Sequence, residues 1–398
     1  MKQSPLSKFG YLLHIGFIAP FRSYERFLVY IAAIIGSGSV MAASFLISFN
    51  LFFYGPLSLL GYFVIRFMFA NLFWLPYLLY AFEKYKLRHF IIPLAIIKIA
   101  ALGLFLSYHD FILTDINFTK GALLAVLNII MSATFWLFHH RLMIEYLSDD
   151  NHGNDISVAE FALNIGALIG AVAGGWAVAA MGFTGALVIC FVLMIAAIII
   201  YFHLMARRPL EKKPFAFFDM YKTIFENISR SSNMIVFSAN HFLLYFFAPV
   251  WMAAIGLSSI KTGIVIALQS LIKFLASPIV GYLTNRNKGE ETLIGATSKT
   301  LGWLPWLFSQ SQILLIPSSI LWFIGSHFYN VGAISRWYKG RSGKYIGASE
   351  ICRGIGRISA SLILIPLLYY SHDMFFVACF MLASLGMVSS KVEKRFLN

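Results

Sequence analysis

The sequence predicts an all-α membrane protein with twelve transmembrane helices, arranged as two pseudo-symmetric bundles of six. Three observations predict this fold: the composition, the repeated occurrence of long apolar stretches, and the placement of lysine and arginine between them. Of the 398 residues, 59% are hydrophobic and 12% are charged, and the mean hydropathy is +0.77. A soluble domain carries about 25% charged residues. We therefore expect the chain to be surrounded by a lipid bilayer.

Twelve stretches are long and apolar enough to cross the hydrocarbon core of a bilayer, which takes about 20 residues as a helix. They cover residues 27–53, 57–82, 90–108, 122–143, 158–180, 183–205, 232–255, 262–283, 292–308, 313–331, 346–370 and 374–388. Because twelve is an even number, both chain ends are expected on the same side of the membrane.

The basic residues indicate which side that is. The chain has 31 Lys and Arg against 17 Asp and Glu, which gives a formal net charge of +14. Of these 31, 23 fall in segments on the side of the chain ends, with Arg141 at the end of the fourth stretch counted in the loop that follows it, and only Lys120 and Lys261 fall in loops on the other side. Short loops rich in Lys and Arg stay in the cytoplasm. We therefore expect an integral protein of a bacterial cytoplasmic (inner) membrane with both termini in the cytoplasm, and no nucleic-acid partner.

The longest interior polar break, after the sixth stretch, divides the chain into two halves. We predict an N-terminal cytoplasmic or interfacial segment at 1–26, a six-helix bundle at 27–206, a cytoplasmic linker at 207–231, a second six-helix bundle at 232–390 and a cytoplasmic tail at 391–398. The second part of the linker is expected to form an amphipathic helix along the membrane surface.

An internal repeat relates the two bundles. At an offset of 190 residues, Glu160 aligns with Glu350 and Gly166 aligns with Gly356, so the fifth and eleventh stretches look like copies. Some transporters are built from two such halves with a central site between them. Small residues also recur at helical spacing in the fifth stretch, which lets a neighbouring helix approach closely.

These features resemble the major facilitator superfamily, over nearly the whole chain. The segment SPIVGYLTNRNKG is similar to the family's cytoplasmic signature Gly-x-Leu-x-Asp-Arg-x-Gly-Arg, with Gly281, Leu283 and Arg286 at matching positions and Asn285 in place of the acid. Glu83 holds the acid position of a second copy between the second and third stretches. The resemblance implies a secondary transporter that works by alternating access, as a monomer and without a cofactor.

Charged groups near the cytoplasmic helix ends are candidates for gating. A carboxylate near a helix N-terminus, or a cation near a C-terminus, can stabilise the closed state. The predicted gating residues are Glu83, Glu160, Asn285, Arg286 and Glu350. Simple helix capping is the alternative role of Glu160 and Glu350.

Ionisable side chains inside the apolar stretches mark a candidate substrate site, because each costs about 2.5 to 3.5 kcal/mol on insertion scales. Six basic residues lie there, namely Arg66, Lys98, Lys273, Lys299, Arg353 and Arg357. The acids nearest to membrane depth are Glu160 and Glu350, and Glu350 can pair with Arg353 one helical turn later. This surplus of cations predicts a small anionic substrate, whose carboxylate or phosphate supplies the missing charge.

The resemblance implies that the first, fourth, seventh and tenth spans line a central cavity, with the second, fifth, eighth and eleventh beside it. The predicted substrate-binding residues are Arg66, Lys273, Arg353, Arg357, Asn240, His241 and His327. The two histidines are also candidates for carrying a coupling proton, because histidine titrates near neutral pH. Lys98 and Lys299 lie in the peripheral third and ninth spans, where we expect them to reach the bilayer surface or to bind an acidic lipid.

The leading hypothesis is a secondary active transporter that moves a small or amphipathic organic anion across the cytoplasmic membrane. One alternative is a proton-driven exporter of drug- or siderophore-like molecules, and another is a non-transporting membrane receptor or assembly factor on the same scaffold. We do not expect an enzyme, since the chain has no HExxH and no GxSxG motif. The three cysteines share no metal-like spacing, so no metal site is predicted.

Overall fold

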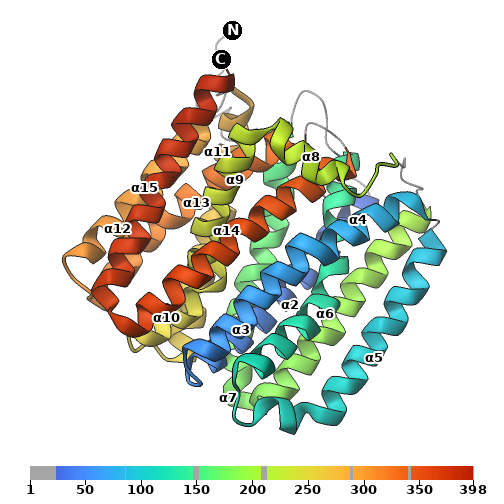
Figure 1. The fold of residues 1–398 in the computed structure, drawn as a ribbon, viewed down its shortest axis with the longest axis horizontal. Coiled ribbons are helices and arrows are strands. Elements are labelled where there is room, and N and C mark those ends of the chain that lie inside the picture. The colour runs from blue at the N-terminus through green and yellow to red at the C-terminus, as the bar shows by residue number, and fades with distance from the viewer. Residues whose placement is uncertain are drawn as a thin grey trace.

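The computed structural model describes residues 24–85, 87–146, 152–207, 213–286, 290–338 and 342–397, and Figure 1 shows them as a bundle of long helices. These residues contain helices of three kinds and no β-strand. The all-α prediction is confirmed. The side chains of Asn285 and Arg286, and all residues of the segment 1–23, lie outside the described part.

The N-terminal half provides the first six predicted spans. Its elements are α2 (Tyr24–Phe52), α3 (Pro56–Phe67), the π-helix η3 (Met68–Trp74), α4 (Leu75–Lys84), α5 (Leu87–Leu113), α6 (Phe118–Tyr146) and α7 (His152–Arg207). The second span is continuous through α3, η3 and α4. The fifth and sixth spans both belong to α7, which turns at Gly182. Its φ of 73° is a conformation that glycine adopts without steric cost.

The C-terminal half begins after the linker and provides the other six spans. Its elements are α8 (Asp219–Glu226), α9 (Ile228–His241), the π-helix η4 (Phe242–Phe246), α10 (Ala248–Ala254), α11 (Ser259–Arg286), α12 (Glu290–Trp303), the 3-10 helices η5 (Leu304–Leu307) and η6 (Gln312–Leu314), α13 (Leu315–Tyr338), α14 (Gly343–Tyr370) and α15 (His372–Leu397). The seventh span bends by 57° between η4 and α10.

Within the described residues, ten helices are long and apolar enough to cross a membrane, or eleven if the bent pair of the seventh span is counted as one. The remaining predicted span, at 292–308, corresponds to α12 with η5. The helix α12 has 14 residues and is by itself too short to cross a membrane, but it lies beside α13 and α15 in the bundle (Figure 1). The observed helices therefore agree with the twelve predicted from the apolar stretches.

The small residues of α7 pack the helix against two neighbours. Gly166 and Gly170 face the backbone of α2 around Gly38, whereas Gly175 faces Ser259 and Gly263 of α11. One stripe of small residues therefore holds α7 against a helix of its own half and a helix of the other half. Close backbone approach of this kind replaces the hydrophobic drive that lipid does not supply.

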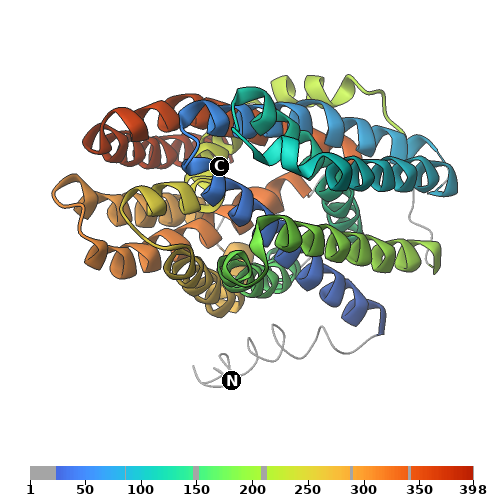
Figure 2. The same cartoon turned by 90° about the horizontal axis from the view of Figure 1, so that it is seen from below.

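The linker helix α8 lies at the end of the bundle where α14 begins and α15 ends (Figure 1). Met220 packs on Gly347 of α14, and the Tyr221 hydroxyl donates to the carbonyl of Leu72 at 2.8 Å. Phe218 and Phe225 are both 76% exposed on the opposite face. The expected amphipathic helix is therefore present, with one face against both halves. Figure 2 shows α8 at the edge of the bundle seen from below.

We predict that Gly170→Ala lowers the free energy of unfolding by about 1–3 kcal/mol, the usual cost of overpacking. A Cβ at this position would overlap the carbonyl oxygen of Gly38, which belongs to the backbone and has no rotamer to change. Thermal unfolding of the purified protein in detergent measures the loss. Gly103→Ala in α5 is the matched control, because nothing lies within 4 Å of the added atom. Equal midpoints for the two variants would contradict the packing argument.

Candidate functional site

A cavity of about 200 Å³ lies between the two halves. Its walls come from α2, α3, η3, α4, α6 and α7 of the first half and from α9, η4, α13 and α14 of the second. Aromatic and aliphatic side chains form much of the lining, including Trp136, Phe237 and Ile334. The predicted residues Arg66, Arg353, Arg357, His241, Glu160 and Glu350 also line it. The structure therefore brings together side chains that are up to 291 positions apart in the chain, from Arg66 to Arg357.

Arg66 and Arg357 converge on one aromatic ring from opposite halves. Their guanidinium carbons lie 4.9 Å and 5.0 Å from the ring centre of Phe246 in η4. Both also lie within 6 Å of Phe67, at 5.8 Å and 5.4 Å. Cation–π contacts of this length are attractive. The two aromatic rings therefore hold two like charges at the same wall of the cavity.

Neither of these guanidinium groups bonds to a carboxylate in the described part of the chain. Arg66 donates to the Tyr62 hydroxyl at 2.7 Å and to the Ser44 hydroxyl at 3.0 Å, and both acceptors are neutral. Arg357 is buried, and its Nε has no acceptor. This wall of the cavity is consequently electropositive, and its hydrogen-bond donors are not all used.

The same wall joins the two halves through aromatic contacts. Phe63 and Phe67 of α3 meet Phe242 and Phe246 of η4, edge to face, with ring centres 5.1 to 5.8 Å apart. The rings of Phe63 and Phe242 are fully buried. A further contact joins the last turns of two other helices: the Tyr369 hydroxyl of α14 donates to the carbonyl of Phe52 in α2 at 2.7 Å. The halves are therefore in contact on this side of the cavity.

A second set of contacts joins the halves on the side where the chain ends lie. Glu350 accepts a hydrogen bond from Asn71 of η3 at 2.7 Å and from Arg353 of its own helix at 2.8 Å. His140 of α6 lies 3.7 Å from the Glu350 carboxylate and is hydrogen-bonded to the hydroxyl of Tyr338 in α13. All these side chains line the cavity. Both sides of the cavity are thus bordered by contacts between the halves.

Glu160 faces the cavity from α7 and interacts with Asn330 of α13 across the gap between the halves. Asn164, one turn further along α7, is 4% exposed, and its Nδ2 has no partner. The nearby Ser157 hydroxyl donates to the carbonyl of Ser277 in α11. Glu160 therefore lies between α7 and the second half, and its role as a gating residue stays a prediction.

Three of the predicted binding residues lie behind the cavity wall. Lys273 is buried with its Nζ 3.4 Å from the ring centre of Tyr245, a residue that does line the cavity. His327 shares a hydrogen bond of 2.9 Å with Ser277. Asn240 donates to the carbonyl of Leu382 in α15 at 3.0 Å. Direct contact of these three with a cargo stays a prediction, because the structure places other atoms in front of them or turns them away.

Glu83 belongs to a buried ion pair at the end of α4. Its carboxylate accepts from the Arg141 Nε at 2.7 Å and from the backbone N–H of Lys213 at 2.9 Å. Arg141 is 3% exposed inside α6, so the interpretation of this residue as part of a cytoplasmic loop is wrong. The carboxylate of Glu83 supplies the negative charge that allows Arg141 to be buried. A gating role for Glu83 stays a prediction, as it does for Asn285 and Arg286.

The expectation for the two peripheral lysines is also wrong. Lys98 points inward and donates to the carbonyls of Ile130 and Met131 in α6, at 2.5 Å and 2.6 Å. Lys299 lies 5.1 Å from the ring centre of Phe237 and 4.8 Å from that of Tyr329. Both lysines are buried among helices, so neither reaches the bilayer surface.

Asn71 and Tyr338 are not among the residues predicted from the sequence, although both border the cavity and contact the opposite half. Asn71 is a single uncharged amide in the apolar run MFANLFW, and its position depends on the π-helix η3. Short π-helical segments occur often at functional sites. An amide inside an apolar span is the feature of the sequence that could have identified Asn71 as a site residue, and this feature is weak because an uncharged amide is tolerated at many positions.

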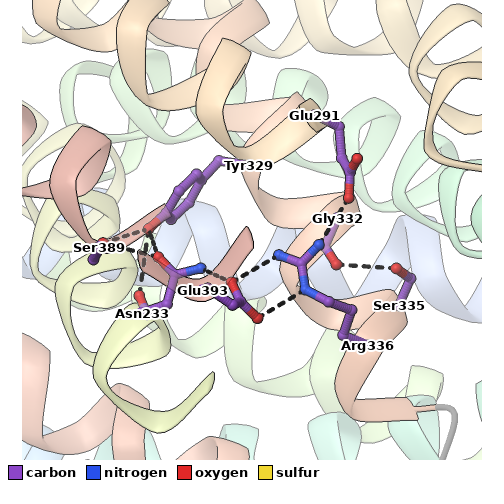
Figure 3. A network of polar contacts seen from close by, with 8 residues as sticks. All are labelled: Asn233, Glu291, Tyr329, Gly332, Ser335, Arg336, Ser389 and Glu393. Carbon is purple, nitrogen blue, oxygen red and sulfur yellow. Dashed lines mark hydrogen bonds and ion pairs between the residues drawn. The ribbon is translucent and has the colours of Figure 1, made fainter. Parts of the chain in front are cut away.

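A separate cluster of buried charges lies between helices of the second half, outside the cavity (Figure 3). Arg336 of α13 bonds both carboxylate oxygens of Glu393 in α15, at 2.9 Å and 3.1 Å, and one oxygen of Glu291 in α12, at 2.8 Å. Asn233 of α9 donates to Glu393 and accepts from the Tyr329 hydroxyl. The cluster ties four helices together, and Arg336 uses three donors in doing so.

Two comparisons with known proteins agree on the fold, and a third found no match. The family model described as Major Facilitator Superfamily matches residues 26–361. Among solved structures, the crystal structure of the human organic anion transporter MFSD10 (TETRAN) is similar to this chain with a TM-score of 0.64 and 11% identity, and the match covers 94% of this chain and 100% of that chain. No curated protein sequence matches the chain.

We predict that Arg336→Ala destabilises the protein by about 3–5 kcal/mol, the usual cost of removing one partner from a buried ion pair. The loss leaves Glu393 and Glu291 without the cation that they share. Lys394→Ala is the matched control at the same end of the bundle. Its ion pair with Glu290, at 2.9 Å, is partly exposed, so we expect a change of about 0–1 kcal/mol. Thermal unfolding in detergent compares the two variants, and similar losses would contradict the structural role of Arg336.

Proposed function

This chain belongs to the Major Facilitator Superfamily and is an integral membrane transporter. We propose that its cargo is a small or amphipathic organic anion. We further propose that it is a secondary active carrier that works by alternating access. A bacterial cytoplasmic membrane, with both chain ends on the cytoplasmic side, is the location that the distribution of basic residues supports.

The observation that carries this proposal is the pair of arginines at the wall of the cavity. Removing two cations from water is expensive, and an uncompensated charge at membrane depth is more expensive still. Arg353 has Glu350 as a hydrogen-bonded partner. Among the described residues, by contrast, Arg66 donates to two neutral hydroxyls, and Arg357 lies against aromatic rings with Glu350 as a more distant countercharge. A carboxylate, phosphate or sulfonate of the cargo would supply the missing negative charge, and guanidinium groups bind such anions with good geometry.

The rest of the cavity supports a cargo with an apolar body. The lining beyond the arginines includes Trp136, Phe237, Ile129 and Leu163. The volume of about 200 Å³ is below the roughly 300–1,000 Å³ of pockets for drug-sized ligands. We therefore propose that the anionic group binds between Arg66 and Arg357 and that a small aryl or alkyl group lies against the apolar wall.

Contacts between the halves on both sides of the cavity support alternating access. The aromatic contacts of α3 with η4 lie on one side, and the bonds of Glu350 and Tyr338 lie on the other. Carriers with two halves expose a central site to each side of the membrane in turn. In this proposal each set of contacts opens in one stage of the cycle.

Lys273 and His327 complete the proposed site from behind the wall. Lys273 adds a positive charge next to Tyr245, and His327 fixes Ser277 in the same region of α11. We propose that these residues, with Asn240, hold the lining side chains in place. Coupling of a proton to transport through His241 or His327 rests on the ordinary titration range of histidine.

We predict that Arg357→Ala lowers the uptake of labelled organic anions into proteoliposomes by about 30-fold or more in kcat/KM, without reducing expression. The lower limit corresponds to about 2 kcal/mol, the smaller end of the cost of truncating one partner of a buried charge pair. Uptake of benzoate, phenyl phosphate and benzenesulfonate should be measured in parallel. Lys261→Ala, which removes an exposed cation far from the cavity, is the control and should transport as the unaltered protein does.

Unchanged uptake by the Arg357→Ala variant would contradict the anion site. A proton-driven exporter would instead move protons out of the vesicle lumen as the added substrate enters, and it would tolerate the loss of Arg357. A receptor or assembly factor would transport none of the three anions.

A further inference from the structure

The carboxylate of Glu350 is a built-in anion next to the proposed cargo site. It is 4% exposed, it lines the cavity, and its Oε1 accepts from the Nη1 of Arg353 at 2.8 Å. The Nε and Nη2 of the same guanidinium are buried and have no partner. Arg353 thus binds Glu350 with one nitrogen while two others remain available. Arg357 lies one turn further along α14 and also has an unused Nε.

The second oxygen of Glu350 holds the two halves together. Its Oε2 accepts from the Nδ2 of Asn71 at 2.7 Å, across the boundary between α14 and η3. Gly354 allows this approach, because a Cβ at that position would overlap the side chain of Asn71. Asn71 is 4% exposed, so its amide is removed from water as well. We name the three residues Asn71, Glu350 and Arg353 the Glu350 bridge.

We propose that the cargo anion competes with Glu350 for Arg353 and thereby weakens the bond between Glu350 and Asn71, so that cargo binding promotes opening on the side of the chain ends. This inference rests on the proposed function, since it takes an anion as the cargo. It adds a specificity and coupling role for Glu350 that the anion site alone does not require. A neutral ligand of the same shape would not compete and would leave the Glu350 bridge closed.

The competition follows from the charges that face one another. Arg353 and Arg357 are four positions apart on α14 and share a helix face, so a carboxylate bound at Arg357 lies near the two unpartnered nitrogens of Arg353. Each hydrogen bond that Arg353 gives to the cargo reduces its attraction for Glu350, and the cargo also repels the Glu350 carboxylate directly. The neighbouring His140 bonds Tyr338 through its Nδ1, and its Nε2 lies 3.7 Å from the Oε1 of Glu350, beyond hydrogen-bond length, so it does not replace Asn71 or Arg353 in this arrangement.

Thermodynamic linkage turns the proposal into a measurable effect. If cargo binding weakens the Glu350 bridge, then weakening the Glu350 bridge must strengthen cargo binding by the same factor. Glu350→Gln removes the competing charge but keeps an oxygen that can accept from Asn71. Asn71→Ala removes the bond between the halves but leaves the pair of Glu350 with Arg353. Glu350→Asp keeps the charge and shortens the side chain by one methylene group.

Equilibrium binding of labelled benzoate, phenyl phosphate and benzenesulfonate to the purified full-length protein tests the competition. We expect Glu350→Gln to bind at least one of them about tenfold more tightly, a typical coupling between two sites, and Asn71→Ala to shift affinity in the same direction. Glu350→Asp should stay within about twofold of the unaltered protein, a change below 1 kcal/mol. Ser384→Ala is the control, because its hydroxyl bonds only within α15, away from the cavity.

A second measurement follows the distance between the two halves. Spin labels at Lys84→Cys in α4 and Lys391→Cys in α15, both exposed positions, report the separation of the halves on the side of the chain ends. We expect benzoate to increase the separation in the otherwise unaltered protein. Asn71→Ala, which removes the bond between the halves, should show an increased separation before any anion is added.

The outcomes separate the two proposals. If Glu350→Gln binds the anions with unaltered or lower affinity while the unaltered protein binds them, the competition is wrong and the anion site stands. If Asn71→Ala leaves the separation of the labels unchanged, the Glu350 bridge does not hold the halves together. If the unaltered protein binds none of the three anions, the anion carrier is contradicted, and the competition falls with it.

Discussion

A cation buried among transmembrane helices must be balanced by some other group, and this constraint explains most of the polar structure of the protein. Lys98 is balanced by two backbone carbonyls, and Lys299 by two aromatic rings. Arg336 is balanced by two glutamates. Each of these groups has its partners among neighbouring helices. Arg66 and Arg357 differ from these cations in position, because both lie at the wall of a cavity between the halves, where a bound anion can reach them.

The halves are joined by contacts of two kinds. Small residues bring α7 against both α2 and α11, so the backbones there are nearly in contact. Around the cavity, by contrast, the halves meet through aromatic edges and a few hydrogen bonds of Glu350 and Tyr338. Contacts of the second kind are few and side-chain based, so they can separate and form again without disturbing the helices. Stable helices and exchangeable contacts between them are what a carrier with two alternating states needs.

The spans could be predicted from the sequence because hydrocarbon imposes the same requirement on every segment that crosses it: the backbone must satisfy its own hydrogen bonds, and the surface must be apolar. The arginines of the site could also be predicted, because a charge in an apolar stretch is conspicuous. What the sequence could not show is the direction in which a buried side chain points. Lys98 and Arg66 are both single cations in apolar stretches. Lys98, however, bonds to a carbonyl of its own half, whereas Arg66 lines the cavity. Asn71 and Tyr338 carry no charge, and only the three-dimensional arrangement reveals their contacts.

The π-helix η3 has a consequence for which side chains the second span presents to the cavity. A π-turn closes its hydrogen bond one residue later than an α-turn, so a single inserted residue is enough to create one in an existing helix. Arg66 and Asn71 are five positions apart, a spacing that an α-helix would point in different directions. Around η3 both side chains line the same cavity. The wider turn of η3 thus brings the cation and the amide of the first half to one surface of the cavity.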